Sequence, residues 1–117
     1  MKDQKIESRE GLTHIREAIH QIEVFIQGIS KEVFLDDQLV ASAVLFQFSV
    51  IGEAIIHVDI DLLSSCDYPW HKVRAFRNLI SHVYFQIKLE AVWDVIVNDL
   101  PELRQVIDIL LDREFSN

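Results

Sequence analysis

The sequence predicts an all-α fold: an antiparallel four-helix bundle with short additional helices, in which residues 1–117 form a single domain. Apolar residues recur at alternating spacings of three and four in two long stretches, which is the period of an amphipathic helix. The chain has only three Gly and two Pro, too few for the many tight turns of an all-β fold. Half of its 117 residues are hydrophobic, so it can bury one core but is too short for two.

The first helix is predicted from a stripe of apolar residues that is sustained for five turns. The stripe consists of Leu12, Ile15, Ile19, Ile22, Ile26 and Ile29. Gly28 and Ser30 are predicted to end this helix. The stretch after it, SKEVFLDD, is predicted to form a short turn with Phe34 and Leu35 pointing inward.

The second helix, Leu39–Val58, is apolar nearly all round, so it needs more than one packing partner. One partner is its own bundle, and we expect the other to be a second subunit in a two-fold homodimer. Gln47, Glu53 and His57 interrupt the apolar run, so a buried helix is a better interpretation than a membrane span. Glu53 and His57 are four residues apart and could pair on one side of the helix.

The last segment, residues 89–110, repeats the alternation of three and four, and its phase continues through Pro101. Two interpretations are open: one kinked helix, or two helices that stack nearly in line. Asp99 and Glu102 have the spacing of a capping box, which favours a restart with Pro101 in the first turn of a new helix.

The charge distribution limits the possible partners. A net charge of −8 argues against a general nucleic-acid binder, because phosphate contacts need Lys and Arg. Residues 68–89, however, contain four basic side chains and no Asp or Glu, which leaves a net charge of −12 for the rest. The four are Lys72, Arg74, Arg77 and Lys88. We interpret this segment as one basic patch on an acidic body, with Lys72 and Arg74 as candidate RNA-binding residues.

The location of the protein is predicted from its only cysteine and from its N-terminus. The single Cys66 excludes an internal disulfide and fits a reducing cytosol. The first residues, MKDQKIESREG, are charged and lack an apolar region, so no signal peptide is predicted. We therefore expect a cytoplasmic protein that does not associate with a membrane.

The third helix, predicted from about Trp70 to Val83, carries a polar strip opposite its core face. On a wheel of about 100° per residue, the polar side chains fall within an arc of about 140°. They are Arg77, Asn78, Ser81 and His82. An ordinary solvated face has the same pattern, so the spacing alone does not decide between a site and a surface.

The chemistry of these side chains favours a site. Arg77 can only be a fixed cation, which suits a phosphate or a pentavalent transition state. His82 titrates near neutrality and can move protons, while Asn78 can orient an attacking or leaving oxygen. Glu53 is either part of a structural ion pair or a carboxylate that orients Arg77 or His82.

This set fits cleavage of RNA without a metal or cofactor, in which the ribose 2′-OH attacks the adjacent phosphate. The reaction needs both a base and an acid, and a two-fold dimer would supply a second His82. The sequence contains no Gly-rich phosphate loop, zinc-ligand spacing or nucleophile elbow.

The spacing around the strip resembles that of a known family. Four residues separate Arg77 from His82, and one more separates His82 from Tyr84. The three stretches FLDDQLVASAVLFQFSVIGEA, YPWHKVRAFRNLISHVY and VWDVIVNDLPEL resemble, in order and spacing, the HepT-like proteins of the HEPN superfamily. The likeness extends from about residue 12 to residue 110. It implies a homodimeric, HEPN-like helical bundle whose Arg77 and His82 form a metal-independent ribonuclease site at the subunit interface.

The resemblance also implies a toxin of a type VII-like toxin–antitoxin system in the prokaryotic cytoplasm. Its antitoxin would be a minimal nucleotidyltransferase that silences the nuclease by attaching AMP to Tyr84. One departure is Val83, which stands where the family more often has a small or polar residue. An alternative from another class is a non-catalytic helical dimer that binds a nucleotide or a nucleotidyltransferase as a regulatory module. The acidic net charge favours this alternative, whereas the intact Arg77 and His82 favour catalysis.

Overall fold

Helices form nearly all of the part of the chain that the structure, a computed structural model, describes: residues 3–79 and 89–115. No strand occurs in these residues, so the predicted all-α fold class is confirmed. The elements are α1 (Gln4–Ile26), α2 (Lys31–Asp36), α3 (Gln38–Ala54), η1 (Ile55–His57), α4 (Ile60–Ser64), α5 (Trp70–Ala75), η2 (Phe76–Asn78), α7 (Leu89–Asn98) and α8 (Leu100–Phe115).

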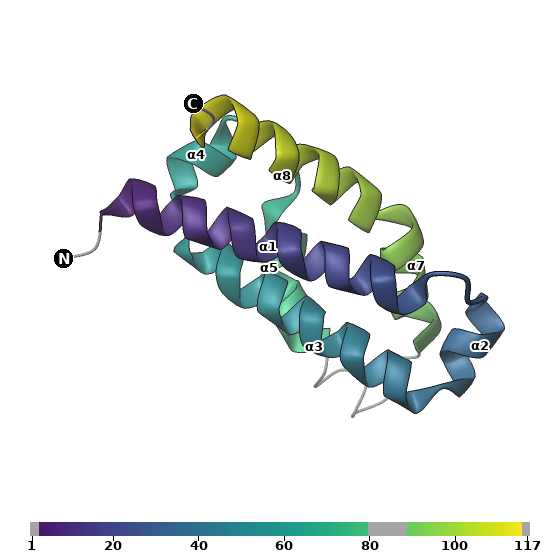
Figure 1. The fold of residues 1–117 in the computed structure, drawn as a ribbon. Coiled ribbons are helices and arrows are strands. Elements are labelled where there is room, and N and C mark those ends of the chain that lie inside the picture. The colour runs from purple at the N-terminus through teal and green to yellow at the C-terminus, as the bar shows by residue number, and fades with distance from the viewer. Residues whose placement is uncertain (1–2, 80–88, 116–117) are drawn as a thin grey trace.

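Helix α1 forms the centre of the bundle, with α3 along one side and α8 along the other, both antiparallel to it (Figure 1). The predicted stripe faces these neighbours, and its members from Leu12 to Ile22 are completely buried. The helix ends at Ile26, because the backbone of Gly28 turns away with a φ of 76°. The last stripe residue, Ile29, therefore lies outside the helix, where it packs against the core from the turn.

The stretch predicted as a short turn forms helix α2. The Ser30 hydroxyl accepts a hydrogen bond from the backbone N–H of Val33 at 3.2 Å and so caps its N-terminus. Phe34 is completely buried, as predicted, and its ring centroid lies 5.2 Å from that of Trp93 on α7. Leu35 is half-buried. Helix α2 thus closes one end of the bundle.

Helix α3 has one buried face and one exposed face. With η1 it forms a segment, Gln38–His57, that is long and apolar enough to cross a membrane by length and composition alone. Of the most apolar part of this segment, 44% is buried inside the protein. The buried side chains include Val44, Phe48 and Ile51, which pack in the core.

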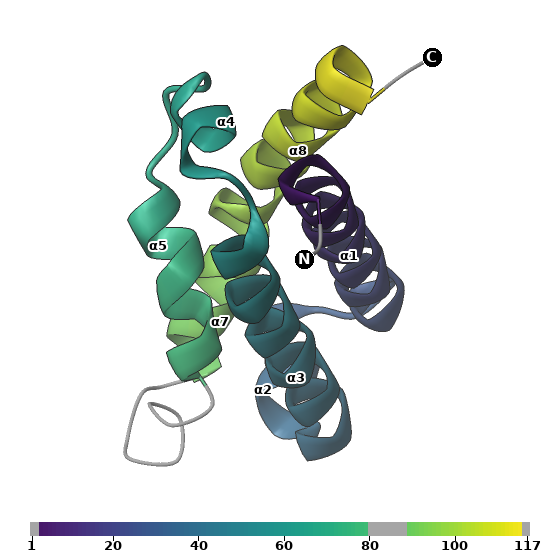
Figure 2. The same ribbon diagram turned by 90° about the vertical axis from the view of Figure 1, so that its left-hand side faces the viewer.

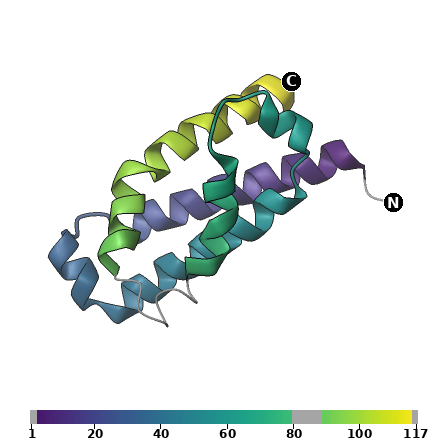
Figure 3. The ribbon, with the colours of Figure 1, turned by 180° about the vertical axis from the view of Figure 1, so that it is seen from behind.

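The last segment consists of two helices, so the structure decides between the two interpretations that the sequence left open. Helix α7 ends at Asn98, and α8 restarts at Leu100 with Pro101 in its first turn. The backbone N–H of Asp99 still donates to Val95, while its carbonyl already accepts from Leu103 at 3.0 Å. Figure 3 shows that the chain bends between the two helices.

The predicted continuous helix over residues 70–83 is wrong at its centre. Helix α5 ends at Ala75, and the chain tightens into the 3₁₀ turn η2. Both pack on α3 from the side away from α1 (Figure 2). The side chain of Phe76 is buried against Phe48, and the backbone of Arg77 lies directly over α3, so tertiary packing sets the local geometry here. Because a 3₁₀ turn has about three residues per turn, the wheel of about 100° per residue does not hold at Arg77.

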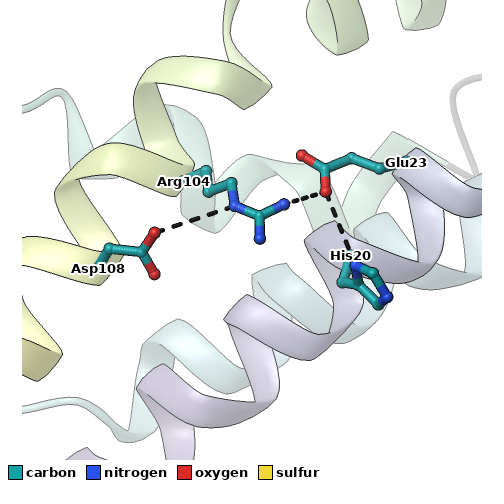
Figure 4. A network of polar contacts seen from close by, with 4 residues as sticks. All are labelled: His20, Glu23, Arg104 and Asp108. Atoms are coloured by element: carbon teal, nitrogen blue, oxygen red, sulfur yellow. Dashed lines mark hydrogen bonds and ion pairs between the residues drawn. The ribbon is translucent and has the colours of Figure 1, made fainter.

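A surface network joins α1 to α8 (Figure 4). The Arg104 guanidinium pairs with Glu23 of α1, and its Nε lies 3.9 Å from Asp108 of α8. His20 lies 3.9 Å from the same Glu23 carboxylate. The hydrogen bond to Glu23 raises the pKa of Arg104 above its usual value, although burial opposes this. Since these groups are about one-third or more exposed, the network adds at most about 1 kcal/mol to stability.

Candidate functional site

The described candidate residues come from three elements that meet at the end of α3. Arg77 and Asn78 lie on η2, Lys72 and Arg74 on α5, and Glu53 in the last turn of α3. All five side chains are exposed. The predicted residues Ser81, His82 and Tyr84 lie outside the described residues, and their roles stay predictions.

Two inward-facing residues of α3, four positions apart, hold η2 in place. The ring of Phe48 meets the ring of Phe76 edge-on, with centroids 5.0 Å apart and an interplanar angle of 75°. One turn later, Gly52 faces the backbone of Arg77 so closely that a Cβ at this position would lie 2.4 Å from the Arg77 nitrogen. A contact this short is impossible for any side chain, so the absence of a Cβ at Gly52 lets Arg77 occupy its place.

The residue after this glycine supplies the charge partner of Arg77. Glu53 Oε2 lies 3.6 Å from Arg77 Nη1, and Glu53 Oε1 lies 3.9 Å from His57 Nε2. The predicted pairing of Glu53 with His57 is thus confirmed, and the structure also brings Glu53 to Arg77. On its other side, His57 Nδ1 lies 3.1 Å from Glu7 Oε1 of α1.

These groups stand beside a groove between α1 and α3 with a volume of about 570 Å³. Glu7, Glu53 and His57 line it together with Val50 and Ala54. The side chains of Arg77 and Glu53 are 50% and 64% exposed, so both can meet a ligand from solvent.

The arrangement can bind an anion at a fixed cation. A guanidinium is a fixed cation in proteins, and the planar fork of Arg77 matches the oxygens of a phosphate. The exposed side chains of Arg74 and Lys72 extend positive charge along α5. Within residues 3–79 and 89–115, no group of three or more His, Cys, Asp or Glu side chains could hold a metal ion.

The sequence did not reveal the roles of Gly52 and Glu7, and it revealed only one of the two contacts of His57. Gly52 stands in the quoted stretch IGEA, but nothing in the sequence showed which backbone would approach it. His57 was expected only as a partner for Glu53, and its second contact comes from a helix 50 residues earlier in the chain. Glu7 precedes the apolar stripe and carries no signal of its own, because its proximity to His57 depends on how α1 packs against α3.

Comparisons with known proteins place the chain among ribonucleases. The family described as "Ribonuclease HepT-like" matches residues 15–110. The protein named "Putative RNase MJ0127" of Methanocaldococcus jannaschii is 30% identical over 112 residues, which cover 94% of this chain and 93% of that protein. "Probable ribonuclease HepT" of Thermococcus cleftensis is 31% identical over 82% of this chain and 88% of its own length. "Putative RNase TTE0752" of Caldanaerobacter subterraneus subsp. tengcongensis is 26% identical over 91% and 96%. The comparison with solved structures gives no significant match.

Proposed function

Because the chain belongs to the HepT-like ribonuclease family, we propose that it is an endoribonuclease of the HEPN type that cleaves RNA without a metal ion. The observation that carries this proposal is the placement of Arg77. Its backbone packs directly against Gly52, and its side chain is half exposed beside Glu53. An arginine whose backbone is fixed and whose side chain is open to solvent is suited to bind a phosphate that arrives from solvent.

In the proposed reaction, the ribose 2′-oxygen attacks the adjacent phosphorus and the bond to the 5′-oxygen breaks. One His82 takes the proton of the 2′-OH, and a second His82 gives a proton to the departing 5′-oxygen. The products are a 2′,3′-cyclic phosphate and a 5′-hydroxyl. Arg77 stabilises the negative charge that develops on the phosphoryl oxygens, while Asn78 orients the attacking or leaving oxygen.

The need for two copies of His82 makes the homodimer part of the proposal. The large apolar side chains of Leu39 and Phe46 are 81% and 59% exposed on the outward side of α3. Leu39, Phe46 and Glu53 are spaced by seven residues, so they lie nearly on one line along α3. An exposed apolar face that leads directly to the partner of Arg77 supports a two-fold interface at which both sites meet.

Regulation by a nucleotidyltransferase antitoxin follows from the family resemblance at Tyr84. AMP on this hydroxyl would place a phosphate seven residues after Arg77, and the phosphate would compete with RNA for the same basic patch. We therefore propose that the protein is the toxin of a type VII-like pair and that adenylylation at Tyr84 silences it.

The test is cleavage of RNA by the purified protein in the presence of EDTA. Arg77→Ala and His82→Ala should each lower the rate by about 10²-fold or more, because each removes a group that acts in the transition state. Ile109→Ala, which changes an exposed side chain on α8, is the control and should cleave normally. Cleavage that requires a divalent cation would refute the mechanism. No cleavage of any RNA by the dimer would favour the non-catalytic regulatory module instead.

A further inference from the structure

Four side chains form a continuous series of polar contacts from α1 to the guanidinium of Arg77. Glu7 Oε1 lies 3.1 Å from His57 Nδ1, and His57 Nε2 lies 3.9 Å from Glu53 Oε1. Glu53 Oε2 in turn lies 3.6 Å from Arg77 Nη1. The two oxygens of Glu53 therefore serve different partners, and so do the two nitrogens of His57.

The backbone around His57 is firmly attached to α1. The buried hydroxyl of Ser8 accepts a hydrogen bond from the backbone N–H of Asp59 at 2.9 Å. Three residues later on α1, Gly11 packs so closely that a Cβ there would lie 3.0 Å from the Ala54 carbonyl oxygen. These contacts flank η1 on both sides, so the imidazole of His57 projects from a backbone with little freedom to move.

Glu53 needs such an anchor more than its neighbours do. Its side chain is 64% exposed, and its contact with Arg77 joins two flexible side chains near the surface. An isolated exposed pair of this kind is weak, because the Coulomb attraction barely exceeds the entropy of ordering both side chains. A second partner on the other carboxylate oxygen restricts the rotamers of Glu53 and lowers that entropic cost.

We propose that His57 is a positioning residue for the reaction: held by Glu7, it orients Glu53, and Glu53 orients the guanidinium of Arg77. Its effect on cleavage rests on the proposed function, whereas the orientation of Arg77 does not. The groove beside the series is also lined by Glu10 and His14.

Glu53 could instead hinder Arg77, and the two roles predict opposite changes in the cleavage rate when the charge of Glu53 is removed. If the carboxylate mainly neutralised Arg77 and competed with the phosphate, removing its charge would raise the cleavage rate. If it orients Arg77, removing it lowers kcat and changes KM little, since Arg77 acts on charge that develops in the transition state.

The kinetic experiment measures RNA cleavage by His57→Ala in two backgrounds. In the otherwise unchanged protein, kcat should fall about 5-fold with KM changed less than 2-fold, which is the size expected for loss of one exposed pair. In the Glu53→Gln background, the same substitution should have no further effect, because His57 acts through Glu53. His57→Gln, which keeps a polar side chain at this position, should retain more activity than His57→Ala.

The matched control is His20→Ala. His20 is also an exposed histidine beside a glutamate, Glu23, but it belongs to the network between α1 and α8. It should leave kcat unchanged. Denaturation curves of the variants check that each rate is measured on folded protein.

A second measurement does not depend on catalysis. The NMR signal of the Arg77 side-chain Nε–H, assigned by its loss in Arg77→Lys, should move toward that of free arginine in both His57→Ala and Glu53→Gln. It should stay unchanged in His20→Ala. An unchanged Arg77 signal in His57→Ala, or fully additive losses of kcat with Glu53→Gln, would overturn the inference. Normal cleavage by Arg77→Ala would instead refute the proposed function, and the NMR result would still decide whether His57 orients Arg77.

Discussion

Gly52→Ala tests whether the close packing of the Arg77 backbone against Gly52 of α3 matters for function. The added Cβ would lie 2.4 Å from the Arg77 nitrogen and 2.8 Å from its Cβ, whereas ordinary contacts begin at 3.4 Å. Since the obstructing atoms include backbone rather than the end of a flexible side chain, η2 must move away from α3 by about 1 Å.

Such a shift should affect both stability and rate. Overpacking costs about 1–3 kcal/mol, and the better helix propensity of Ala returns up to about 1 kcal/mol. We therefore expect a net loss of about 0–3 kcal/mol in the free energy of unfolding. A displacement of about 1 Å at a catalytic group can lower the rate about 10²-fold, so the loss of RNA cleavage should far exceed what the loss of stability explains.

Gly28→Ala is the matched control. Gly28 has a φ of 76°, so Ala is strained there and costs about 1–2 kcal/mol, although no atom lies within 4 Å of the new Cβ. It lies before α2, at the opposite end of α3 from Gly52. Urea unfolding and cleavage rates would be compared for both variants well below their midpoints. If Gly52→Ala cleaves RNA as fast as Gly28→Ala at equal stability, the packing of Arg77 against Gly52 is not needed for cleavage.

Three further predictions concern the dimer, the regulation and the stability of the protein. Phe46→Glu should convert the dimer to a monomer in sedimentation experiments and abolish cleavage. Ile109→Glu, at a similarly exposed apolar position on α8, should remain a dimer. If the unaltered protein is a monomer at micromolar concentration, the proposed interface is wrong. Incubation with ATP and the partner nucleotidyltransferase should add the mass of AMP to the protein, as measured by intact-mass spectrometry. The Tyr84→Phe variant should stay unmodified and active. An added mass on another residue would refute the role of Tyr84. Burial, followed by the charges of Asp99 and Glu102, raises the pKa of Tyr68 to about 12, so the free energy of unfolding should fall as the pH rises from about 10 toward 12. Because Tyr68 is only partly buried, solvent screening should keep this loss to about 1–2 kcal/mol. Tyr68→Phe should lack this part of the decline, and equal slopes in the two proteins would show that Tyr68 is not its source.

The sequence predicted the parts of the fold that depend on periodicity. The stripe on α1 is completely buried from Leu12 to Ile22, and the restart of the helix at Pro101 was predicted from the local sequence around it. The tight turn at η2 was missed, because nothing local to Phe76 or Arg77 breaks a helix. Its cause is the packing of Phe76 on Phe48, a contact across 28 positions of the chain that helical periodicity does not contain.

The site residues likewise divide into those that local sequence signals predicted and those that depend on tertiary packing. Arg77 was predicted from the kind of chemistry its side chain can perform, and Glu53 from its spacing to His57, both of which are local signals. Gly52 and Glu7 were missed, because their roles exist only after α3 has packed against η2 and α1. The role of such a glycine becomes visible only when the structure shows which backbone occupies the space that a Cβ would take.

Helix α3 explains why a chain this short can place a charged site beside its core. Phe48 and Gly52 face inward and fix η2, while the next residue, Glu53, faces outward to the guanidinium of Arg77. Neighbouring residues of a helix differ in direction by about 100°, so Gly52 can pack against the backbone of Arg77 while Glu53 pairs with its guanidinium. The exposed apolar line through Phe46 continues from that partner, so a subunit docking there would meet Arg77 at its edge. Substitutions at Gly52 should therefore act on Arg77 through η2 without weakening the dimer, whereas Phe46→Glu should act through the dimer without moving η2. Cleavage measured beside sedimentation separates the two effects, and dissociation of the Gly52→Ala dimer would show that the inner and outer faces of α3 are not independent.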